Sequence, residues 1–215
     1  MSAAFPDPRT VYVLAGCNGA GKTTFAKRYL PEFVNCPTFL NADLIAAELD
    51  PTRPESQNLR AGRMFLQQIR DQSAKGETFG FETTLSGRTY RRLLVDLKNR
   101  GYRLCLFFLW LPSVNMAVSR VANRVSQGGH NIPPEDIRRR YTAGLRNLFG
   151  LYSSQFDAWF LYNASQSPPE LIAWAEEGRF EVREPNLYAR VRILAQVFDE
   201  FRDHEILGDA ASGKG

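Results

Sequence analysis

An apolar run that leads directly into a glycine-rich turn limits the folds open to this sequence more than any other feature. The run is Val11-Tyr12-Val13-Leu14-Ala15, and residues 16–23 then read Gly-Cys-Asn-Gly-Ala-Gly-Lys-Thr. That turn matches the pattern G-x-x-x-x-G-K-S/T, which roughly one chain in a hundred would carry by chance. The apolar run before it and the helix-compatible residues after it predict a strand, a loop and a helix in immediate succession.

The turn has the composition of a phosphate-binding loop. Its glycines let consecutive backbone N–H groups turn inward around a phosphate, and a helix that starts near Gly21 directs its positive end there. The Lys22 ammonium can reach the β- and γ-phosphates of a nucleoside triphosphate, and the Thr23 hydroxyl is a Mg²⁺ ligand in such loops. Cys17 is expected to point away from the phosphates as a small, unreactive side chain. The predicted nucleotide-binding residues are Gly16, Asn18, Gly19, Ala20, Gly21, Lys22, Thr23 and Thr24, with Thr23 as the metal ligand.

The composition is that of an ordinary soluble globular protein. Of the 215 residues, 44% are hydrophobic and 23% are charged, a balance that suits one folded domain. Lys plus Arg number 27 against 23 for Asp plus Glu, and the resulting net charge of +4 is too small to predict binding to nucleic acid. The longest apolar run, residues 104–111, is far shorter than the roughly 20 residues that cross a bilayer, so no membrane association is expected.

The cysteines and the N-terminal residues predict a cytoplasmic protein. Cys17, Cys36 and Cys105 have no pairing or metal-ligand spacing, which is typical of a reducing compartment. Residues 1–10 contain prolines and charges of both signs instead of the apolar core of a signal peptide. We therefore expect an N-terminal tail over residues 1–10, a single domain over residues 11–205 and a flexible tail over residues 206–215.

Short apolar runs alternate with longer amphipathic stretches along the domain, which indicates βα units around a parallel sheet. The run at residues 104–111 is apolar throughout, as in a strand that helices cover on both faces. Helices are expected over residues 60–74 and, at the end of the domain, over residues 187–201. The sequence predicts an α/β fold, a three-layer sandwich with a mostly parallel five-stranded sheet. The expected strands cover residues 11–15, 38–40, 78–81, 104–111 and 158–162.

Two further predicted helices carry a group of arginines. The first begins after Ser113, a good N-cap, and ends at a Gln-Gly-Gly sequence. Arg120 and Arg124 share one face of this helix because they are four residues apart. The second helix contains Arg138-Arg139-Arg140. Two such helices, joined by a glycine hinge, would form a helical lid over about residues 120–145 that excludes water and neutralises charge. The alternative is a solvated helical face.

Two common classes of phosphate-binding-loop protein do not fit the sequence. A GTPase would carry an Asn-Lys-x-Asp segment that reads guanine, and none occurs here. A motor or transporter ATPase would end a later apolar strand in an acid, whereas the long run ends in Trp110-Leu111-Pro112. Small-molecule kinases depend less on that acid and gather acceptor-binding groups at the carboxyl ends of neighbouring strands. Asp43 and Glu82, which follow the second and third expected strands, are such groups.

Asp43 and Glu82 each have a catalytic and a structural interpretation. The Asp43 carboxylate could accept the proton of a hydroxyl that attacks the γ-phosphate, or it could cap the helix that follows it. Glu82 could hold a sugar hydroxyl or a Mg²⁺-bound water, or it could be a capping or surface acid. Phe79 and Phe81 indicate that a buried strand leads directly to Glu82, which favours the functional interpretation.

Four separated segments of the sequence form one ordered set of motifs. They are residues 16–24, the Leu-Asn-Ala-Asp of residues 40–43, the Phe-Glu-Thr-Thr-Leu-Ser-Gly of residues 81–87, and the stretch from Arg124 through Gly-Gly-His-Asn-Ile-Pro at 128–133 to Arg-Arg-Arg-Tyr at 138–141. In this order they resemble the zeta toxin family of P-loop kinases, in its compact bacterial branch. The resemblance covers residues 11 to about 163.

The resemblance implies a P-loop NTPase kinase-like fold with a helical lid, and ATP with Mg²⁺ as the phosphate donor. Toxins of this family phosphorylate the 3′-hydroxyl of the sugar in UDP-N-acetylglucosamine, a small-molecule acceptor. Carried over to this sequence, Asp43 matches the base, Arg124 a phosphate-binding arginine, and Glu82 an acceptor-binding acid. A second phosphate-binding arginine should lie at residues 138–140, and Arg140 is favoured. The catalytic candidates are Lys22, Asp43, Arg124 and Arg140, and the acceptor-binding candidates are Asp43, Glu82, Thr83 and Thr84.

The acceptor stays open at this point. Residues 83–88 read Thr-Thr-Leu-Ser-Gly-Arg, unlike the stretch expected of those toxins, and the chain is shorter. Two enzyme functions are therefore weighed: a kinase of UDP-N-acetylglucosamine or a related nucleotide-sugar, and a kinase of another acceptor such as a free sugar, an antibiotic or a polynucleotide end. The third function is an ATP-binding regulatory module. An antitoxin protein is a candidate partner if the chain acts as a toxin.

Overall fold

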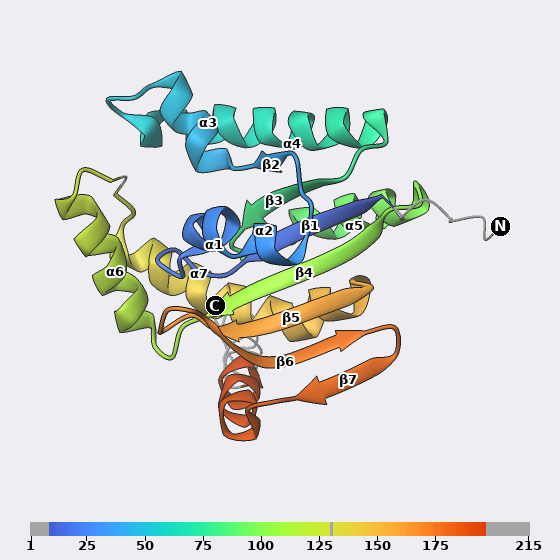
Figure 1. The fold of residues 1–215 in the computed structure, drawn as a ribbon. Coiled ribbons are helices and arrows are strands. Elements are labelled where there is room, and N and C mark those ends of the chain that lie inside the picture. The colour runs from blue at the N-terminus through green and yellow to red at the C-terminus, as the bar shows by residue number, and fades with distance from the viewer. Residues whose placement is uncertain (1–8, 130, 197–215) are drawn as a thin grey trace, which may run out of the picture.

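The β-sheet sets the position of every loop that carries a predicted site residue. The computed structural model describes residues 9–129 and 131–196. Its strands are β1 (Thr10–Ala15), β2 (Phe39–Leu40), β3 (Phe79–Thr83), β4 (Arg103–Trp110), β5 (Ala158–Asn163), β6 (Glu170–Glu176) and β7 (Arg179–Val182). They form one sheet in the order β2-β3-β1-β4-β5-β6-β7 (Figure 1). The first five strands of this order are parallel, as predicted.

The sheet has seven strands instead of the expected five, because a hairpin extends it beyond β5. β6 pairs antiparallel with β5, and β7 pairs antiparallel with β6. Glu177 and Gly178 connect them with φ values of 51° and 76°, the backbone of a tight two-residue hairpin turn. The sequence Glu-Leu-Ile-Ala-Trp-Ala-Glu of β6 contains helix formers, so local propensity gives a weak strand signal there. Pairing with β5, a tertiary effect, decides the outcome.

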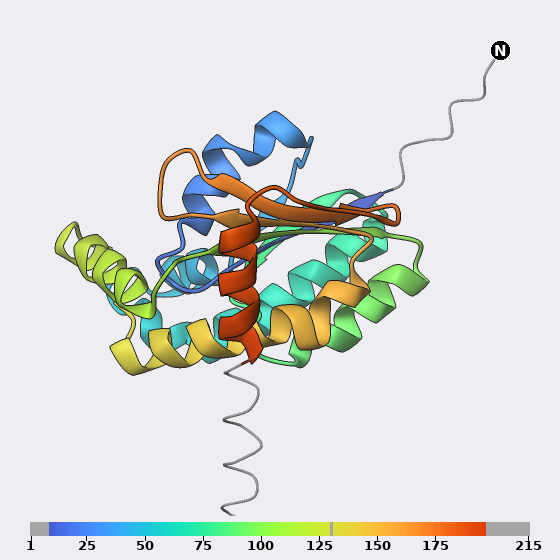
Figure 2. The same ribbon diagram turned by 90° about the horizontal axis from the view of Figure 1, so that it is seen from below.

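Helices cover both faces of the sheet, which confirms the three-layer sandwich (Figure 2). On one face lie α1 (Lys22–Arg28) and α2 (Leu30–Phe33). On the other lie α4 (Asn58–Lys75), α5 (Thr89–Asn99), α7 (Pro134–Asn147) and a helix over residues 185–196. α3 (Ala42–Leu49) and α6 (Val114–Ser126) flank the edge at which the parallel strands end (Figure 1). The described residues also form three short helical turns: η1 (Pro54–Gln57), the π-helical η2 (Leu148–Tyr152) and η3 (Ser153–Gln155).

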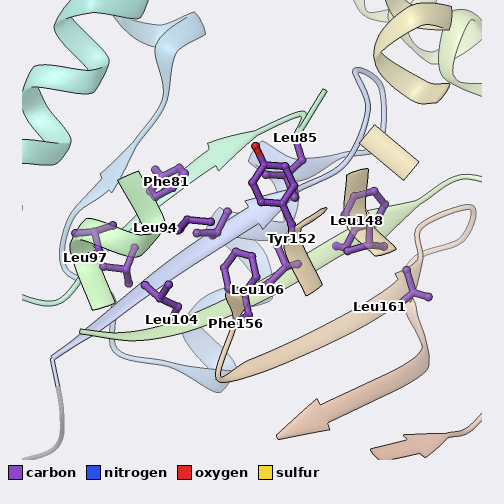
Figure 3. Close-up of a cluster of buried hydrophobic side chains, with 14 of the residues drawn as sticks. Phe81, Leu85, Leu94, Leu97, Leu104, Leu106, Leu148, Tyr152, Phe156 and Leu161 are labelled. Carbon is purple, nitrogen blue, oxygen red and sulfur yellow. The ribbon is translucent and has the colours of Figure 1, made fainter. Parts of the chain in front are cut away.

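β4 divides the core between the two faces of the sheet. Leu104 and Leu106 belong to the larger buried cluster, under α4, α5 and the end of α7 (Figure 3). Cys105 and Phe107 belong to the cluster that packs against α1 and α6. Alternate residues of a strand face opposite sides of the sheet. The uninterrupted apolar run in the sequence is therefore what a strand buried on both faces requires.

The sequence predicts most of the helices. The helix expected over residues 60–74 is α4, and the helix that carries the three consecutive arginines is α7. Ser113 caps α6 as predicted, because its hydroxyl oxygen accepts a hydrogen bond from the backbone N–H of Met116 at 3.2 Å. The helix over residues 185–196 is the first part of the expected closing helix. α5 was not predicted, although Leu94 and Leu97 form its buried side.

Some expectations concern residues outside the described part of the chain. Residues 1–8, His130, the end of the closing helix beyond residue 196 and the tail at residues 206–215 all lie there. Thr10, expected as the last residue of the N-terminal tail, is the first residue of β1. Over residues 9–129 and 131–196, no helix combines the length and the apolar character needed to cross a membrane.

Leu106 offers a test of the core assignment, because it lies in the middle of β4 with a side chain that is 0% exposed. Leu106→Ala should lower the free energy of unfolding by about 2–5 kcal/mol, since it removes buried methyl groups and leaves a cavity. Val95 on α5 is 46% exposed, so Val95→Ala is a control that should change the free energy by less than about 0.5 kcal/mol. Urea unfolding followed by circular dichroism measures both. Similar losses in the two variants would contradict the burial of Leu106.

Candidate active site

The loop between β1 and α1 has a backbone that favours glycine at three positions. Gly16, Gly19 and Gly21 have φ values of 138°, 80° and 86°, in the region that residues with side chains rarely adopt. A Cβ atom on Gly16 would clash with the carbonyl oxygen of Leu109 on β4, and one on Gly19 would lie 2.6 Å from the carbonyl oxygen of Ala117 on α6. The loop is therefore pressed against two neighbouring elements, and its backbone conformation is fixed by both.

Lys22 begins α1 and is buried, with its ammonium inside the loop. Its Nζ donates hydrogen bonds to the carbonyl oxygens of Gly16 at 2.9 Å and of Cys17 at 3.1 Å. The Cys17 side chain is buried as well, and burial raises the pKa of its thiol to about 11. Cys17 therefore stays a neutral thiol at physiological pH, in agreement with the small, unreactive side chain expected there.

Asn41, and not Asp43, caps the helix that follows β2. The Asn41 Oδ1 accepts hydrogen bonds from the backbone N–H of Asp43 at 2.8 Å and of Leu44 at 3.4 Å, and α3 begins at Ala42. Asp43 is an exposed residue in the first turn of α3, where the helix dipole favours a carboxylate. The structural interpretation of Asp43 as the N-cap is therefore wrong, and its side chain is left to face the cavities described below.

The Glu82 carboxylate at the end of β3 lies beside the hydroxyl of Thr23. Thr23 Oγ1 donates a hydrogen bond to Glu82 Oε2 at 3.1 Å. Burial raises the pKa of Glu82 above its ordinary value of 4.5, and the positive charges of Lys22 and Arg124 oppose that shift. Hydroxyl and carboxylate oxygens are ligands that Mg²⁺ accepts together with waters and phosphates.

Thr23 and Glu82 therefore fit a Mg²⁺ ion that is also held by phosphate oxygens. Mg²⁺ usually keeps several waters and binds through one or two protein groups plus the phosphates of a substrate. Within the part of the chain that the structure describes, no three His, Cys, Asp or Glu side chains gather as a metal site.

Two cavities meet at the end of β3. One has a volume of about 350 Å³ and extends from the start of α3 past the loop at residues 83–87 to α7; we name it the α7 cavity. The other, of about 340 Å³, follows the loop at residues 18–24 to α6; we name it the P-loop cavity. Five residues line both cavities: Asn18, Lys22, Asn41, Asp43 and Glu82. A ligand in each cavity would therefore meet the other beside these residues, of which Lys22, Asp43 and Glu82 carry charged groups.

A third cavity of about 260 Å³, here the β5 cavity, continues from the P-loop cavity towards the loop after β5. Gly21, Thr24 and Arg120 line both of these cavities. The Arg120 guanidinium donates hydrogen bonds to the carbonyl oxygens of Ala164 at 2.7 Å and of Ser165 at 2.8 Å. Arg120 therefore fastens α6 to the loop after β5 and forms part of the wall of the β5 cavity.

The consecutive arginines of α7 point in different directions. Arg140 Nη1 donates to Asn18 Oδ1 in the phosphate-binding loop at 3.3 Å, and Arg140 lines the α7 cavity. Arg138 Nη1 donates instead to Asn115 Oδ1 on α6, at 3.2 Å. Arg124 of α6 lines the P-loop cavity. Arg124 and Arg140 thus approach the loop from two different helices.

The two helices of the expected lid differ in how many of their side chains are buried against the rest of the protein. α7 buries Ile137, Tyr141 and Leu145, and the Tyr141 hydroxyl donates to the carbonyl oxygen of Leu111 at 2.9 Å. α6 buries only two of its residues. An opening movement of the site would therefore break fewer packing contacts if α6 moved than if α7 moved.

The structure brings nearly all the predicted site residues together. The P-loop cavity is lined by Asn18, Gly19, Gly21, Lys22, Thr23, Thr24, Asp43, Glu82 and Arg124. The α7 cavity adds Thr83, Thr84 and Arg140. Ala20 lines only the β5 cavity. Gly16 lines none of the three cavities, because it lies where the loop passes close to the carbonyl oxygen of Leu109 on β4.

Further residues of the α7 cavity were not singled out from the sequence. Asn41 could have been weighed beside Asp43, because Asn is a common N-cap residue and Asn41 lies three residues before the apolar pair Leu44-Ile45. Ser86 and Tyr90 carry no local signal of this kind, whereas Arg139 is one of the three consecutive arginines among which the sequence predicts a phosphate-binding residue. These residues reach the cavity because the loop after β3, the start of α5 and the middle of α7 lie at the same edge of the sheet.

Solved structures share this fold. A chain of the AvrRxo1-ORF1:AvrRxo1-ORF2 complex with sulphate ions has a TM-score of 0.68 to this protein at 17% identity, and the complex with ATP gives 0.68 at 18%. Both comparisons cover 86% of this chain but only 63% of the AvrRxo1 chain. A chain of the PezAT chromosomal toxin–antitoxin system of Streptococcus pneumoniae has a TM-score of 0.63 at 19% identity, over 94% of this chain and 88% of its own. At these identities the likeness concerns the fold.

Sequence comparison identifies the family of the chain. An uncharacterized protein of Haemophilus influenzae is 27% identical over 126 residues, which are 59% of this chain and 88% of that protein. Residues 11–147, from β1 to the end of α7, match the AAA domain family AAA_33. This span contains the phosphate-binding loop, both acids and the arginines of α6 and α7, and it is more than half of the 215 residues. The chain therefore belongs to the AAA domain family AAA_33, and it shares its fold with the AvrRxo1 and PezAT chains.

Proposed function

We propose that this protein is an ATP-dependent kinase that transfers the γ-phosphate to a hydroxyl group of a small acceptor. The observation that carries the proposal is the meeting of the P-loop cavity and the α7 cavity at Lys22, Asp43 and Glu82. One cavity suits a triphosphate and the other an acceptor, so phosphate and hydroxyl would face each other across these side chains. Phosphoryl transfer depends mainly on such positioning and on electrostatic stabilisation.

ATP is assigned to the P-loop cavity, with its base in the adjoining β5 cavity beside Arg120. The backbone N–H groups of residues 16–24 would surround the phosphates, and Lys22 would exchange its two carbonyl partners for phosphate oxygens. Thr23 would bind Mg²⁺ directly and Glu82 through a water; the metal neutralises charge on the phosphate oxygens. The AvrRxo1 complex with ATP, which shares the fold, supports this choice of nucleotide.

Asp43 is assigned the role of general base. Its carboxylate, at the boundary of the two cavities, would take the proton of the acceptor hydroxyl while that oxygen bonds to the γ-phosphorus. The bond between the γ-phosphorus and the bridging oxygen then breaks, and ADP leaves with the electron pair. Arg124 and Arg140 would stabilise the charge that develops on the transferred group.

For the acceptor we propose UDP-N-acetylglucosamine or a related nucleotide-sugar, held by Asp43, Glu82, Thr83 and Thr84 in the α7 cavity. The likeness to the PezAT toxin–antitoxin system supports a toxin that acts in the cytoplasm with an antitoxin protein as partner. A free sugar, an antibiotic or a polynucleotide end are the alternative acceptors, because residues 83–88 differ from the stretch expected of zeta toxins. An ATP-binding regulatory module is the alternative function.

Asp43→Asn should slow phosphate transfer by about 10²–10⁴-fold and leave ATP binding unchanged, because an amide cannot take the proton of the hydroxyl. Phosphorus NMR of the protein with ATP, Mg²⁺ and UDP-N-acetylglucosamine would follow a new sugar-phosphate signal, and a titration with ATP would measure binding. A fully active Asp43→Asn enzyme would remove the proposed base. If the unmodified protein gives no such signal, another acceptor is implied; ATP hydrolysis that no acceptor stimulates would favour the regulatory module.

Arg140 and Arg138 provide a matched pair of variants on one helix. Arg140→Ala should lower kcat by about 10²-fold or more, since it removes a charge aimed at the transferred phosphate. Arg138 points to Asn115, so Arg138→Ala should change kcat by less than about threefold. Steady-state kinetics with saturating ATP and acceptor make the comparison. Equal losses would mean that the arginines act only through the general charge of α7.

The half-buried Glu82 carboxylate should make stability depend on pH. Because its pKa in the folded protein is raised above 4.5, the folded state loses stability as the pH rises from 4.5 through that pKa. Glu82→Gln carries no charge there, so without Mg²⁺ and ATP it should unfold at a higher temperature than the unmodified protein at neutral pH. This advantage should shrink as the pH is lowered towards 4.5. Thermal unfolding over a pH series measures it, and a difference independent of pH would contradict the raised pKa.

A further inference from the structure

The loop that follows β3 has an unusual backbone at a fully buried residue. Leu85 has a φ of 51° and a side chain that is 0% exposed, and a bulky residue adopts this region only where its surroundings hold it. The Leu85 N–H donates to Thr83 Oγ1 at 3.1 Å. On either side of Leu85, the hydroxyls of Thr84 and Ser86 share a hydrogen bond of 2.8 Å, and both residues line the α7 cavity. The turn thus buries Leu85 and leaves its two polar neighbours at the cavity.

Two buried side chains from the end of α7 and from η2 hold this loop. Asn147 Nδ2 donates to the carbonyl oxygen of Leu85 at 2.8 Å, and the Tyr152 hydroxyl donates to the carbonyl oxygen of Gly87. Leu85 and Tyr152 belong to the same buried cluster (Figure 3). Burial raises the pKa of Tyr152 to about 12, so the hydroxyl keeps the proton that it donates. Neither Asn147 nor Tyr152 is among the residues that line the α7 cavity.

A glycine lets α7 approach the loop closely. A Cβ atom on Gly144 would lie 2.5 Å from the carbonyl oxygen of Thr84, a distance that would force the loop or the helix to move. Gly144 is one helical turn after Arg140 and three residues before Asn147, so all three residues lie on the same side of α7. The helix that brings an arginine to the phosphate-binding loop therefore also supports the loop after β3.

We propose that Asn147 and Tyr152 are positioning residues that fix residues 83–87 so that Thr84 and Ser86 present their hydroxyls to the acceptor. The acceptor class that suits this pair is a molecule with adjacent hydroxyl groups, as in a sugar, because each side-chain hydroxyl can both donate and accept. The inference rests on the proposed kinase function. Asn147 and Tyr152 act through the loop and do not touch the acceptor themselves.

Tyr152→Phe tests the proposal with little change to the core, because it removes one hydroxyl and leaves the ring in place. It should raise the KM for UDP-N-acetylglucosamine by about three- to tenfold, the effect of one lost hydrogen bond, and change the KM for ATP by less than about twofold. Asn147→Ala should act in the same direction. Tyr141→Phe is the matched control: it removes a hydroxyl that donates to the carbonyl oxygen of Leu111, in the other buried cluster, and should change neither KM.

Hydrogen exchange gives a second readout that does not depend on the acceptor. In Tyr152→Phe and Asn147→Ala, the backbone amides of residues 83–87 should exchange faster, while those of residues 16–24 should not. Tyr141→Phe should leave residues 83–87 unchanged. Unchanged exchange in the first two variants would overturn the proposal, and so would faster exchange with an unchanged KM for the acceptor. Absence of transfer to UDP-N-acetylglucosamine by the unmodified protein counts against that acceptor alone, and the exchange comparison then decides whether the two residues hold the loop.

Discussion

The candidate site depends on the parallel register of β1 with its two neighbours. Leu14 lies opposite Glu82 on one side and opposite Phe107 on the other, so the phosphate-binding loop leaves β1 directly beside Glu82. A shift of β3 by one residue would turn the Glu82 side chain to the other face of the sheet, away from Thr23. Because helices bury both faces, the same shift would misplace the apolar side chains of the core. Core packing thus fixes the geometry of the polar site.

Local patterns explain which parts of the molecule could be predicted from the sequence. The phosphate-binding loop, the N-cap at Ser113 and the alternation within β4 depend on residues close together in the chain, and the structure has all three. The positions of Asp43 and Glu82 follow from one further rule, that parallel strands end at the same edge of the sheet. These rules suffice to bring the two acids to the phosphate-binding loop.

The predictions that were wrong or incomplete depend on contacts between distant segments. The β6–β7 hairpin forms because β5 offers an edge for pairing, which the composition of β6 does not reveal. The sequence also leaves open whether Asn41 or Asp43 caps α3, since both residue types cap helices. The separate directions of Arg138 and Arg140 follow from the packing of α7 between α6 and the phosphate-binding loop, and three consecutive arginines give no sign of it.

The spacing of residues along α7 has a consequence for how such a protein could change its acceptor. Asn147 follows Arg140 by seven positions, about 10 Å of helix. Arg140 lines the α7 cavity, and Asn147 donates a hydrogen bond to the loop after β3. The helix between them therefore fixes the distance and the relative direction of these two side chains. Inserting one residue would rotate one end by about 100° relative to the other, whereas adding a full turn would nearly preserve the facing. A change in the length of α7 between Arg140 and Asn147 can therefore keep both contacts only when it comes in steps of about one helical turn, roughly 5 Å.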